Sequence, residues 1–426
     1  MKRECTYRLL GILLIGTTLL CVSCNNKENS INPIDYDVDT IDIDVFTDRP
    51  TDISPFIDTL ISIPLEATEE SLIGSIDKII AWDSMIYIMD NHYSKAVFVF
   101  DMEGNFIDKI FRVGKGPGEY ADIFDMDVDD QFLYILDSGR KIIKFERNTG
   151  EFLEEHLFDH WKGGEFITAN NGSIVFYDKG FKNTEYFANA VPLCQIYETN
   201  FHGTNMNCVS NHDKRLASVY THAVLTFSRN GNDLFVLPAY TYDYFSVQDS
   251  GLDQLYHLNF GRYNMNIDRI SEMARSTSKE ILNDYLYTSP VVGLLSIFSF
   301  TRDYLAIVYG FNGRQYNMLI DRKNKRLVME GVNVLSSYEF QIGIPMPVAT
   351  HGDFFYSFIE PVTYFSNEDD ERFDLKNLNV DTTKMTRSGE NNPILLKYRL
   401  RSENDELHSQ YTAMKEYMKN MEKEKE

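Results

Sequence analysis

The sequence predicts an all-β fold, a six-bladed β-propeller with four antiparallel strands in each blade. Three observations predict it: a repeat with a period near 46 residues, short strands bounded by Asp and Gly turns inside each repeat, and a spare strand ahead of the first repeat. Aromatic residues make up 13% of the chain, which suits a β-rich fold because aromatic side chains pack well on pleated surfaces.

The repeat is clearest between residues 79–111 and 126–158. The segment YIMD at 87–90 aligns with YILD at 134–137, a shift of 47 residues. In each unit an Asp-led turn follows the second strand, and a Gly hairpin joins the third strand to the fourth. Weaker copies follow at 172–180 with 193–201, at 231–258, at 303–331, and at 352–361 with 392–401.

Six such units fill residues 57–401 if two insertions are allowed, a helical stretch near 266–287 and a polar loop at 362–391. Asn266 is a candidate N-cap for the helical stretch. The spare strand at 59–68 is expected to pair beside 394–400, which would join the two ends of the ring and shield an edge. Residues 402–426 carry apolar residues at helical spacing and are expected to form a C-terminal helical tail.

The N-terminus has the form of a secretory signal. Positive charges precede an apolar run of about fourteen residues, which is shorter than the ~20 residues of a membrane-spanning helix. Ser23 before Cys24 resembles a bacterial lipobox, so residues 1–23 are expected to be a lipoprotein signal peptide and Cys24 the lipidated residue. The aspartate-rich stretch 24–56 is expected to be a flexible tether to the membrane, since it has few large apolar residues to bury.

The chain carries 64 acidic and 41 basic residues, a formal net charge of −23. Without a basic patch it cannot compete for the phosphates of a nucleic acid, so nucleic-acid partners are excluded. Cys194 and Cys208 lie fourteen residues apart, and the sequence leaves open whether they form a disulfide or stay as two thiols.

Several stretches resemble a known family. GKGPGEY at 114–120, the YIMD and YILD strand ends and VFVFDMEGNF at 97–106 resemble the NHL-type six-bladed propellers. They are most similar to the propeller lipoproteins of gut Bacteroidetes, as is SIPLEATEESLIGSIDKI at 62–79. The resemblance implies the propeller fold and a cell-envelope location, with an anchor in the outer membrane. It implies no particular activity.

The glycine-rich segment 111–124 allows two interpretations. A phosphate-binding loop would lead into a helix N-terminus, but here a strand-like run of alternating aspartates follows. The segment is therefore predicted to be a turn from the outer strand of blade 1 to the inner strand of blade 2. Glu119 is expected to accept hydrogen bonds from loop amides, and Tyr120 to pack against the next blade. The turn residues are Gly114, Gly116 and Gly118, which can take positive φ, and Pro117.

Loops of this kind, together with the turns after the second strands, are expected on one face of the disc near the central channel. That face is the predicted ligand-binding surface, although each of its residues could instead be solvated or stabilise a turn. Its residues are Asp90, His92, Lys95, Lys115, Glu119, Asp137, Arg140, Lys141, Tyr240, Tyr242, Asp243, Arg314 and Gln315.

Tyr240, Tyr242 and Tyr244 alternate and are expected to share one strand face, as a sugar-stacking platform or, more simply, as core. Trp161 is a second candidate for sugar stacking. No nucleophile motif and no metal-ligand spacing is found. The leading prediction is a lipid-anchored, non-catalytic module, without a cofactor, that binds a glycan or a protein. The alternatives are a hydrolase or lyase that uses carboxylates or Ca²⁺ in the channel, and a structural scaffold subunit.

Overall fold

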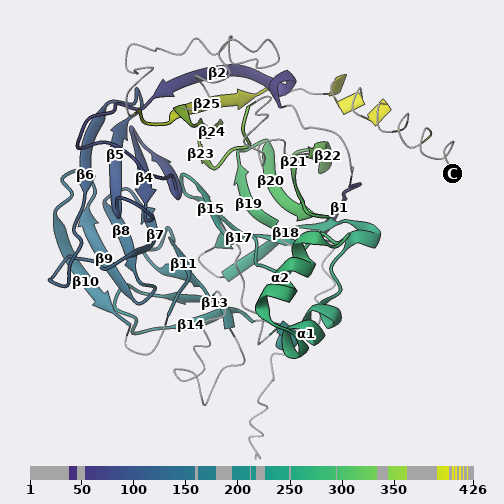
Figure 1. Ribbon diagram of the computed structural model, residues 1–426, viewed down its shortest axis with the longest axis horizontal. Helices are drawn as coiled ribbons and strands as arrows, with labels where there is room; N and C mark the ends of the chain where they lie inside the picture. Colours follow the sequence, from purple (N-terminus) through teal and green to yellow (C-terminus); the bar gives the residue numbers. More distant parts are fainter. Residues whose placement is uncertain are drawn as a thin grey trace, which may run out of the picture. The chain divides into compact units, whose positions relative to one another are not determined.

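The computed structural model shows six β-sheets arranged as the blades of a propeller (Figure 1). Residues from Val38 onward form one compact unit, to which this description applies. The structure describes residues 38–45, 53–158, 162–178, 194–211, 213–216, 226–248, 251–293, 295–332, 344–361 and 391–402, with scattered residues between 405 and 420.

Blades 1 and 2 follow the predicted repeat. Their strands run antiparallel in the order of the chain, from the innermost to the outermost. Blade 1 consists of β3 (Lys78–Trp82), β4 (Met85–Asp90), β5 (Ala96–Asp101) and β6 (Phe106–Ile110). Blade 2 consists of β7 (Ile123–Val128), β8 (Phe132–Asp137), β9 (Lys141–Glu146) and β10 (Phe152–Leu157).

Blades 3, 4 and 5 have the same antiparallel core of four strands. Blade 3 consists of β11 (Glu165–Thr168), β12 (Ile174–Tyr177), β13 (Cys194–Thr199) and β14 (Asn207–Asn211). Blade 4 consists of β15 (Phe227–Asn230), β16 (Asp233–Val236), β17 (Asp243–Gln248) and β18 (Gly251–Asn259). Blade 5 consists of β19 (Leu295–Phe300), β20 (Tyr304–Phe311), β21 (Arg314–Asp321) and β22 (Arg326–Val332).

Blade 6 is built from both ends of the ring, as predicted. The chain supplies β23 (Ala349–His351), β24 (Phe354–Ile359) and β25 (Ile394–Leu400), and the N-terminal strand β2 (Ile57–Pro64) pairs antiparallel with β25 as the outermost strand (Figure 1). Asn392 reinforces this closure from a buried position. Its side chain accepts a hydrogen bond from the Ile73 amide and donates to the carbonyls of Glu66 and Ser71.

Burial explains the pattern of the strands. Four or more successive residues of β4 and β8 are buried, because each inner strand is covered on both faces by neighbouring blades. They are therefore continuous apolar runs. The outermost strand β10 alternates between half-buried and exposed positions, because only one side of it packs inward.

The segment predicted to be a flexible tether is partly a strand, which corrects that prediction. β1 (Asp39–Asp42) pairs in parallel with β18 and adds a fifth strand to the outer edge of blade 4. Ile41 of β1 and Ile43, just after the strand, are buried between blades 4 and 5. The alternation of Ile with polar residues across 39–43 is a strand pattern, and burial of the isoleucines outweighs the local excess of aspartates.

The predicted helical insertion is confirmed as two helices, α1 (Ile267–Ser276) and α2 (Lys279–Thr288). Asn266 caps α1, since its side chain accepts a hydrogen bond from the Arg269 amide. The buried side chains of Ile270 and Leu286 pack with residues of blades 3 and 4. Among the described residues no helix is long and apolar enough to cross a membrane.

Several predictions fall outside the described residues. They concern the signal peptide at 1–23, lipidation of Cys24, the tether before residue 38, Trp161 and most of the polar loop at 362–391. Of the C-terminal tail, the described residues between Asp405 and Asn420 have helical backbone conformation.

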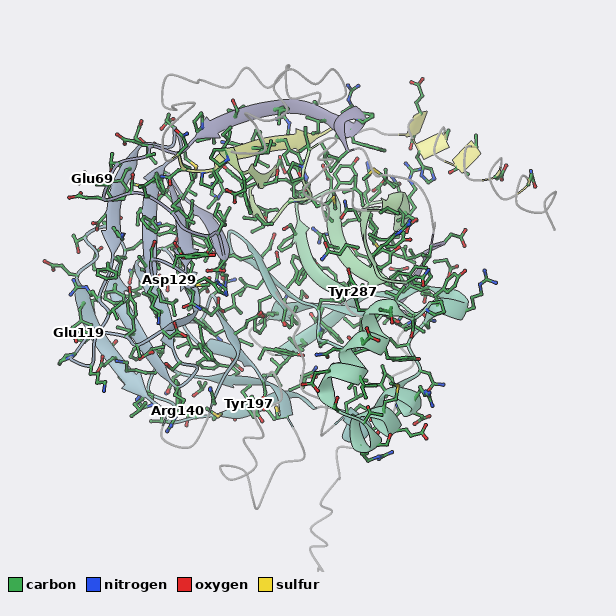
Figure 2. The ribbon with its side chains drawn as sticks, in the orientation of Figure 1. Glu69, Glu119, Asp129, Arg140, Tyr197 and Tyr287 are labelled. Carbon is green, nitrogen blue, oxygen red and sulfur yellow. A yellow bond between two sulfur atoms is a disulfide. The ribbon has the colours of Figure 1, made fainter. Side chains whose placement is uncertain are left out.

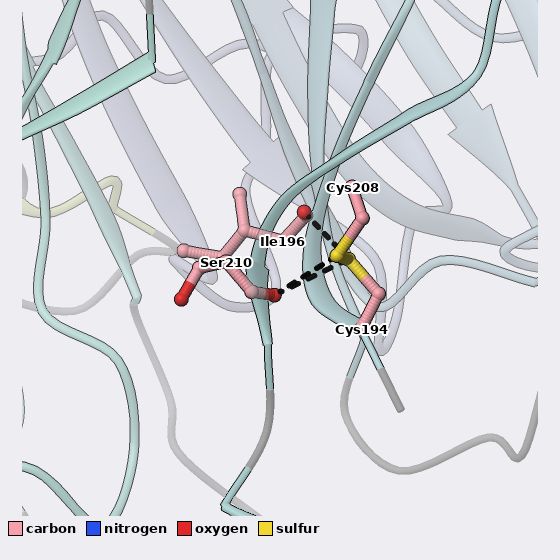
Figure 3. The surroundings of a disulfide bond; sticks show 4 residues. All are labelled: Cys194, Ile196, Cys208 and Ser210. Carbon is pink, nitrogen blue, oxygen red and sulfur yellow. Dashed lines mark hydrogen bonds between the residues drawn. A yellow bond between two sulfur atoms is a disulfide. The ribbon is translucent and has the colours of Figure 1, made fainter. Parts of the chain in front are cut away.

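A disulfide joins Cys194 to Cys208, which resolves the alternative that the sequence left open (Figure 3). The bond connects β13 to β14, the two outer strands of blade 3. Its Cα atoms are 5.7 Å apart, within the range that a disulfide spans without moving the backbone.

Replacing both cysteines by serine is expected to lower the free energy of unfolding by about 3 kcal/mol, because the cross-link restricts a loop of fourteen residues in the unfolded chain. Urea unfolding of the oxidised protein and of the double variant measures this difference. Equal midpoints would show that the cross-link contributes nothing to stability.

Candidate functional site

The turn after β4 is organised by a buried carboxylate. Asp90 accepts hydrogen bonds from the amides of Gly74 (2.8 Å) and Tyr93 (2.9 Å) and from the hydroxyl of Ser75 (3.0 Å). Burial by itself raises the pKa of Asp90, but hydrogen bonds from Tyr93, Ser94 and Gly74 outweigh it and hold the pKa below its ordinary value. Asp90 thus stabilises the turn and is not exposed for a ligand.

Asp137 repeats this arrangement in blade 2. Its Oδ1 accepts a hydrogen bond from the backbone amide of Ala121 at 3.1 Å. Ala121 lies sixteen residues before Asp137, the same separation as between Gly74 and Asp90. Lys95 of blade 1 reaches across to the same segment, with Nζ 3.2 Å from Asp122 Oδ1. The segment 121–123 therefore ties the second-to-third-strand turns of the first two blades into one surface, here called the loop face.

Tyr93 is the most exposed large side chain of the loop face, and sequence reasoning missed it. It is 76% exposed, and its backbone amide is held by Asp90. Close packing fixes it further, since a Cβ on Gly74 would lie 2.5 Å from the Tyr93 Cβ. Beside it, His92 is an exposed side chain whose Nδ1 lies 2.7 Å from Asp77 Oδ1. The sequence HYSK at 92–95 does not indicate that the Tyr93 ring is exposed, because the direction of the side chain depends on the conformation of the turn.

The glycine-rich loop is a blade-to-blade turn, as predicted, but it lies elsewhere on the ring. Glu119 sits at the outer edge beside β10, away from the ring centre (Figure 2). The Gly118 amide donates to Glu155 of β10 at 2.9 Å. The prediction that this loop lies near the central channel is therefore wrong. Lys115 is exposed.

The glycines of this loop serve two different purposes. Gly118 has a φ of +72°, whereas Gly114 and Gly116 do not have positive φ, which corrects the prediction for those two. Positions 114 and 116 favour glycine because the Glu119 carboxylate lies against them and leaves little room for a side chain. It accepts the Gly116 amide at 2.7 Å, and a Cβ on Gly114 would lie 2.0 Å from Glu119 Oε2.

Tyr120 is fully buried, as expected of a residue that packs between blades 1 and 2. Its hydroxyl donates to backbone carbonyls of blade 1, Lys95 and Ile110, each at 3.0 Å. Lys141 has its Nζ 3.5 Å from Glu155 and also bonds the Glu119 carbonyl, while Arg140 is exposed at the outer edge (Figure 2).

The tyrosines of blade 4 do not form a platform. Tyr240 and Tyr242 are buried, and Tyr244 is fully buried, so the packing alternative holds and the ligand-contact prediction is wrong for the first two. They share no strand face, because Tyr240 has a φ of +61° in the turn before β17. The Tyr242 hydroxyl donates a hydrogen bond to the Val292 carbonyl at 2.7 Å.

Asp243 is also engaged within the fold, since it accepts from Gln254 at 2.7 Å and lies 2.8 Å from His257 Nδ1. Arg314 is exposed and Gln315 half-buried at the start of β21 in blade 5. The turn between β20 and β21 is a second-to-third-strand turn like those of blades 1 and 2, so these two residues belong to the same side of the ring but not to the surface around Tyr93.

The axis of the ring holds a cluster of charges that sequence reasoning did not locate. Lys78 Nζ lies 2.7 Å from Asp125 Oδ1, and Asp125 also accepts the Phe166 amide at 2.9 Å. Burial by itself lowers the pKa of Lys78, but Asp125, Asp127 and Glu165 together raise it above its ordinary value. Burial and Glu165 raise the pKa of Asp125 against the opposing effect of Lys78.

A second buried ion pair joins blades 2 and 4 near the axis. Arg229 of blade 4 donates to Asp127 of blade 2 at 2.8 Å, and its guanidinium stacks 5.1 Å from the ring of Trp82 in blade 1. Asp127 also accepts the amide and hydroxyl of Thr168 in blade 3. The next residue, Asn230, exchanges two hydrogen bonds with the backbone of Gly352 in blade 6.

The axial charges therefore bind the blades to one another. In the described part of the chain, no group of three or more His, Cys, Asp or Glu side chains is arranged to hold a metal ion.

Six β-sheets arranged in a ring, which the pairing of β2 with β25 closes, define a six-bladed β-propeller. The chain belongs to the family described as Domain of unknown function (DUF4934), which matches residues 38–399. No curated protein matches it.

Among solved structures, the chain is similar to a protein of Bacteroides fragilis described as exported, with a TM-score of 0.68 and 17% identity over 85% of this chain and 100% of that one. This likeness shows the fold alone. U3-55K matches with a TM-score of 0.42 and 9% identity over 80% of this chain and 98% of that one. BamB from Moraxella catarrhalis matches with a TM-score of 0.35 and 10% identity over 63% and 65%. Neither of these two matches says anything of function.

Replacing Asp90 by asparagine is expected to lower the free energy of unfolding by about 2 kcal/mol at neutral pH. The two carboxylate oxygens of Asp90 each accept a backbone N–H, whereas asparagine has one oxygen and an NH₂ group, so one backbone N–H would face another donor. The folded pKa of Asp90 lies below its ordinary value of 3.8. Its contribution is therefore present above that value and is lost as the pH falls through the folded pKa. Urea titrations at several acidic pH values should show a shallower acid loss of stability in the variant; parallel pH curves would contradict the assignment.

Proposed function

We propose that the protein is a non-catalytic binding module of the cell envelope, held to the outer membrane by lipid on Cys24. It contacts a glycan or a protein through the loop face of blades 1 and 2. The observation that carries the proposal is the Tyr93 side chain, 76% exposed on a turn whose backbone is held by a buried carboxylate. A large amphipathic ring carried on a fixed backbone offers contact area while only its two side-chain torsions need to be ordered on binding.

The surroundings of Tyr93 supply polar partners for a ligand. His92 has an exposed ring that can donate and accept, and Lys95, at the end of the same turn, pairs with Asp122 of the segment 121–123. Such a combination of an aromatic surface and flanking hydrogen-bonding groups suits a sugar or the side chains of a protein partner.

The axis supports binding over catalysis as the role of the ring. A catalytic group needs to reach a substrate, whereas Asp125 and Asp127 are buried and paired with Lys78 and Arg229. The hydrolase or lyase alternative, with carboxylates or Ca²⁺ at this axis, would require those pairs to open. A scaffold role in an envelope complex is the alternative in which the loop face contacts only protein.

Location in the envelope is supported by three features. The N-terminal sequence has the form of a secretory signal and resembles a lipobox at Ser23 and Cys24, the matched Bacteroides fragilis protein is described as exported, and the Cys194–Cys208 disulfide suits an oxidising compartment.

The test uses the chain from residue 27 onward, applied to a glycan array and to pull-downs from envelope extracts. A ligand of the loop face should bind Tyr93→Ala at least about tenfold more weakly, the loss expected of a central aromatic contact. Tyr287→Ala, which removes a 48% exposed tyrosine from α2, is the matched control and should bind as the parent does. Equal binding by Tyr93→Ala, or no binder of either class, would overturn the proposal.

The anchor is tested separately by fractionating cells that produce the full chain. Cys24→Ala should move the protein from the membrane to the soluble fraction. Retention of the variant in the membrane would contradict lipid anchoring without affecting the loop-face proposal.

A further inference from the structure

Large apolar side chains are exposed along one side of the ring, on the outermost strands of blades 6, 1 and 2. Of the nine large hydrophobic residues exposed in the described part of the chain, six lie on these strands or directly after β6. These six residues are called the apolar rim: Ile61, Ile107, Phe111, Val113, Leu153 and Leu157.

The exposed positions follow the repeat. Ile61, Ile107 and Leu153 lie 46 residues apart, and Phe111 and Leu157 are separated by the same interval. An outermost strand ordinarily presents polar side chains to water, so an apolar residue at the same position of three successive blades points to a surface that is covered in use.

The opposite side of the same ring is already covered by the chain itself. β1 adds to the free edge of β18 in blade 4, and its buried Ile41 contributes to the core there. Farther along, Ile53 and Phe56 are buried in one apolar cluster with residues of blades 5 and 6, among them Val328 of the outermost strand of blade 5. Blade 4 thus shows that an outer edge in this ring accepts an extended segment that is apolar at every second residue.

Blade 2 offers the same kind of edge without a cover. Among the described residues no strand pairs with the outer side of β10, and Leu153 and Leu157, 45% and 52% exposed, lie on the same side of it. The glycine-rich loop holds this edge in place, because Gly118 donates to Glu155 and Arg112 Nη2 donates to the Gly150 carbonyl at 3.2 Å. The edge is therefore fixed before any partner arrives.

Charge distinguishes among the possible occupants. Asp108 and Glu151 are exposed along the rim, whereas Glu155 is already engaged with Lys141 and the Gly118 amide. Arg112 and Lys115 are exposed on the glycine-rich loop, but the chain as a whole carries a net charge of −23. The nearby Lys109 is engaged with the rings of Phe98 and Phe111. A second copy of this chain would be repelled, and so would an anionic lipid surface, whereas a basic segment is attracted.

We propose that the free edge of β10 binds an extended segment of a partner protein, in which apolar residues alternate with lysine or arginine. The segment adds as a further strand of blade 2 and places its apolar side chains beside Leu153 and Leu157. Its basic side chains lie on the opposite face of the strand, which carries Glu154, and are attracted by the net negative charge of the chain. This surface is distinct from the loop face around Tyr93.

The test measures fluorescence anisotropy of a labelled peptide in which valine or isoleucine alternates with lysine. The parent protein should bind it, and Leu153→Glu/Leu157→Glu should bind at least about tenfold more weakly, because the apolar contacts are lost. Ile281→Glu places one such glutamate at a 54% exposed apolar position on α2 and should bind as the parent does. Circular dichroism and urea midpoints establish that each variant is folded.

Two further probes separate strand addition from other contacts. The same peptide methylated on alternate backbone amides should lose binding, since a strand needs those donors, and a peptide with the lysines grouped at one end should bind weakly. Equal binding of the methylated peptide, unchanged binding by the double variant, or no peptide binding at all would overturn the proposal. So would binding of anionic phosphatidylglycerol vesicles in place of the peptide, which would identify the rim as a lipid contact. Tyr93→Ala should leave peptide binding unchanged, so this test can fail independently of the loop-face proposal.

Discussion

Replacing Arg229 by methionine is expected to lower the free energy of unfolding by about 3–5 kcal/mol, the cost of removing one partner from a buried ion pair. Methionine keeps much of the side-chain length but leaves the buried Asp127 carboxylate without its 2.8 Å partner. It also removes the stacking on Trp82 and the contact with Thr168, so blades 1, 2 and 3 each lose a bond to blade 4. Urea unfolding followed by tryptophan fluorescence measures the loss.

Arg215→Met is the matched control. Arg215 also forms two carboxylate contacts, with Asp213 and Asp268, but its side chain is 49% exposed, so the pairs are screened by water. Its replacement should cost less than about 1 kcal/mol. Equal losses of unfolding free energy in the two variants would contradict the prediction, because the buried Arg229–Asp127 pair would then contribute no more than the exposed pairs of Arg215.

Truncating the chain to begin at Glu66 is expected to abolish cooperative folding. This truncation removes β2, and with it the outermost strand of blade 6, the pairing with β25 and the buried side chain of Ile63. Buried apolar residues of β25, such as Leu396 and Tyr398, would then be left beside an unpaired edge. We expect loss of the sigmoidal urea transition and a tendency to aggregate.

A chain that begins at Ile53 is the control for this truncation. It loses β1 but keeps β2 and the buried Ile53 and Phe56. It should unfold at a lower urea concentration than the full chain, yet in one cooperative step. A cooperative transition in the chain that begins at Glu66 would show that ring closure by β2 is dispensable.

The repeated architecture was predictable because its signals are local. The matching YIMD and YILD segments became β4 and β8, Asn266 caps α1, and the spare strand became β2. Each of these depends on side-chain period, turn chemistry or capping, which act over a few residues and are visible in a single sequence.

The site was less predictable because it depends on contacts between distant segments. Gly114 and Gly116 suggested positive φ, but the cause of their small size is the carboxylate of Glu119 folded onto them. Tyr240 and Tyr242 have a pattern that fits either a platform or a core, and only the position of neighbouring elements places them inside. The Asp127–Arg229 pair joins residues 102 positions apart, so no spacing rule could have found it.

The pairing of β2 with β25 has a consequence for how the protein reaches its location. Strands whose paired residues lie 330 or more positions apart must meet before the ring is complete, so the last contact waits until nearly all of the chain is available. A chain that crosses a membrane from its N-terminus can carry β2 across early without closing the ring prematurely. In the exported protein that we propose, this strand order would leave the ring open until the C-terminal part of the chain has followed β2 across the membrane.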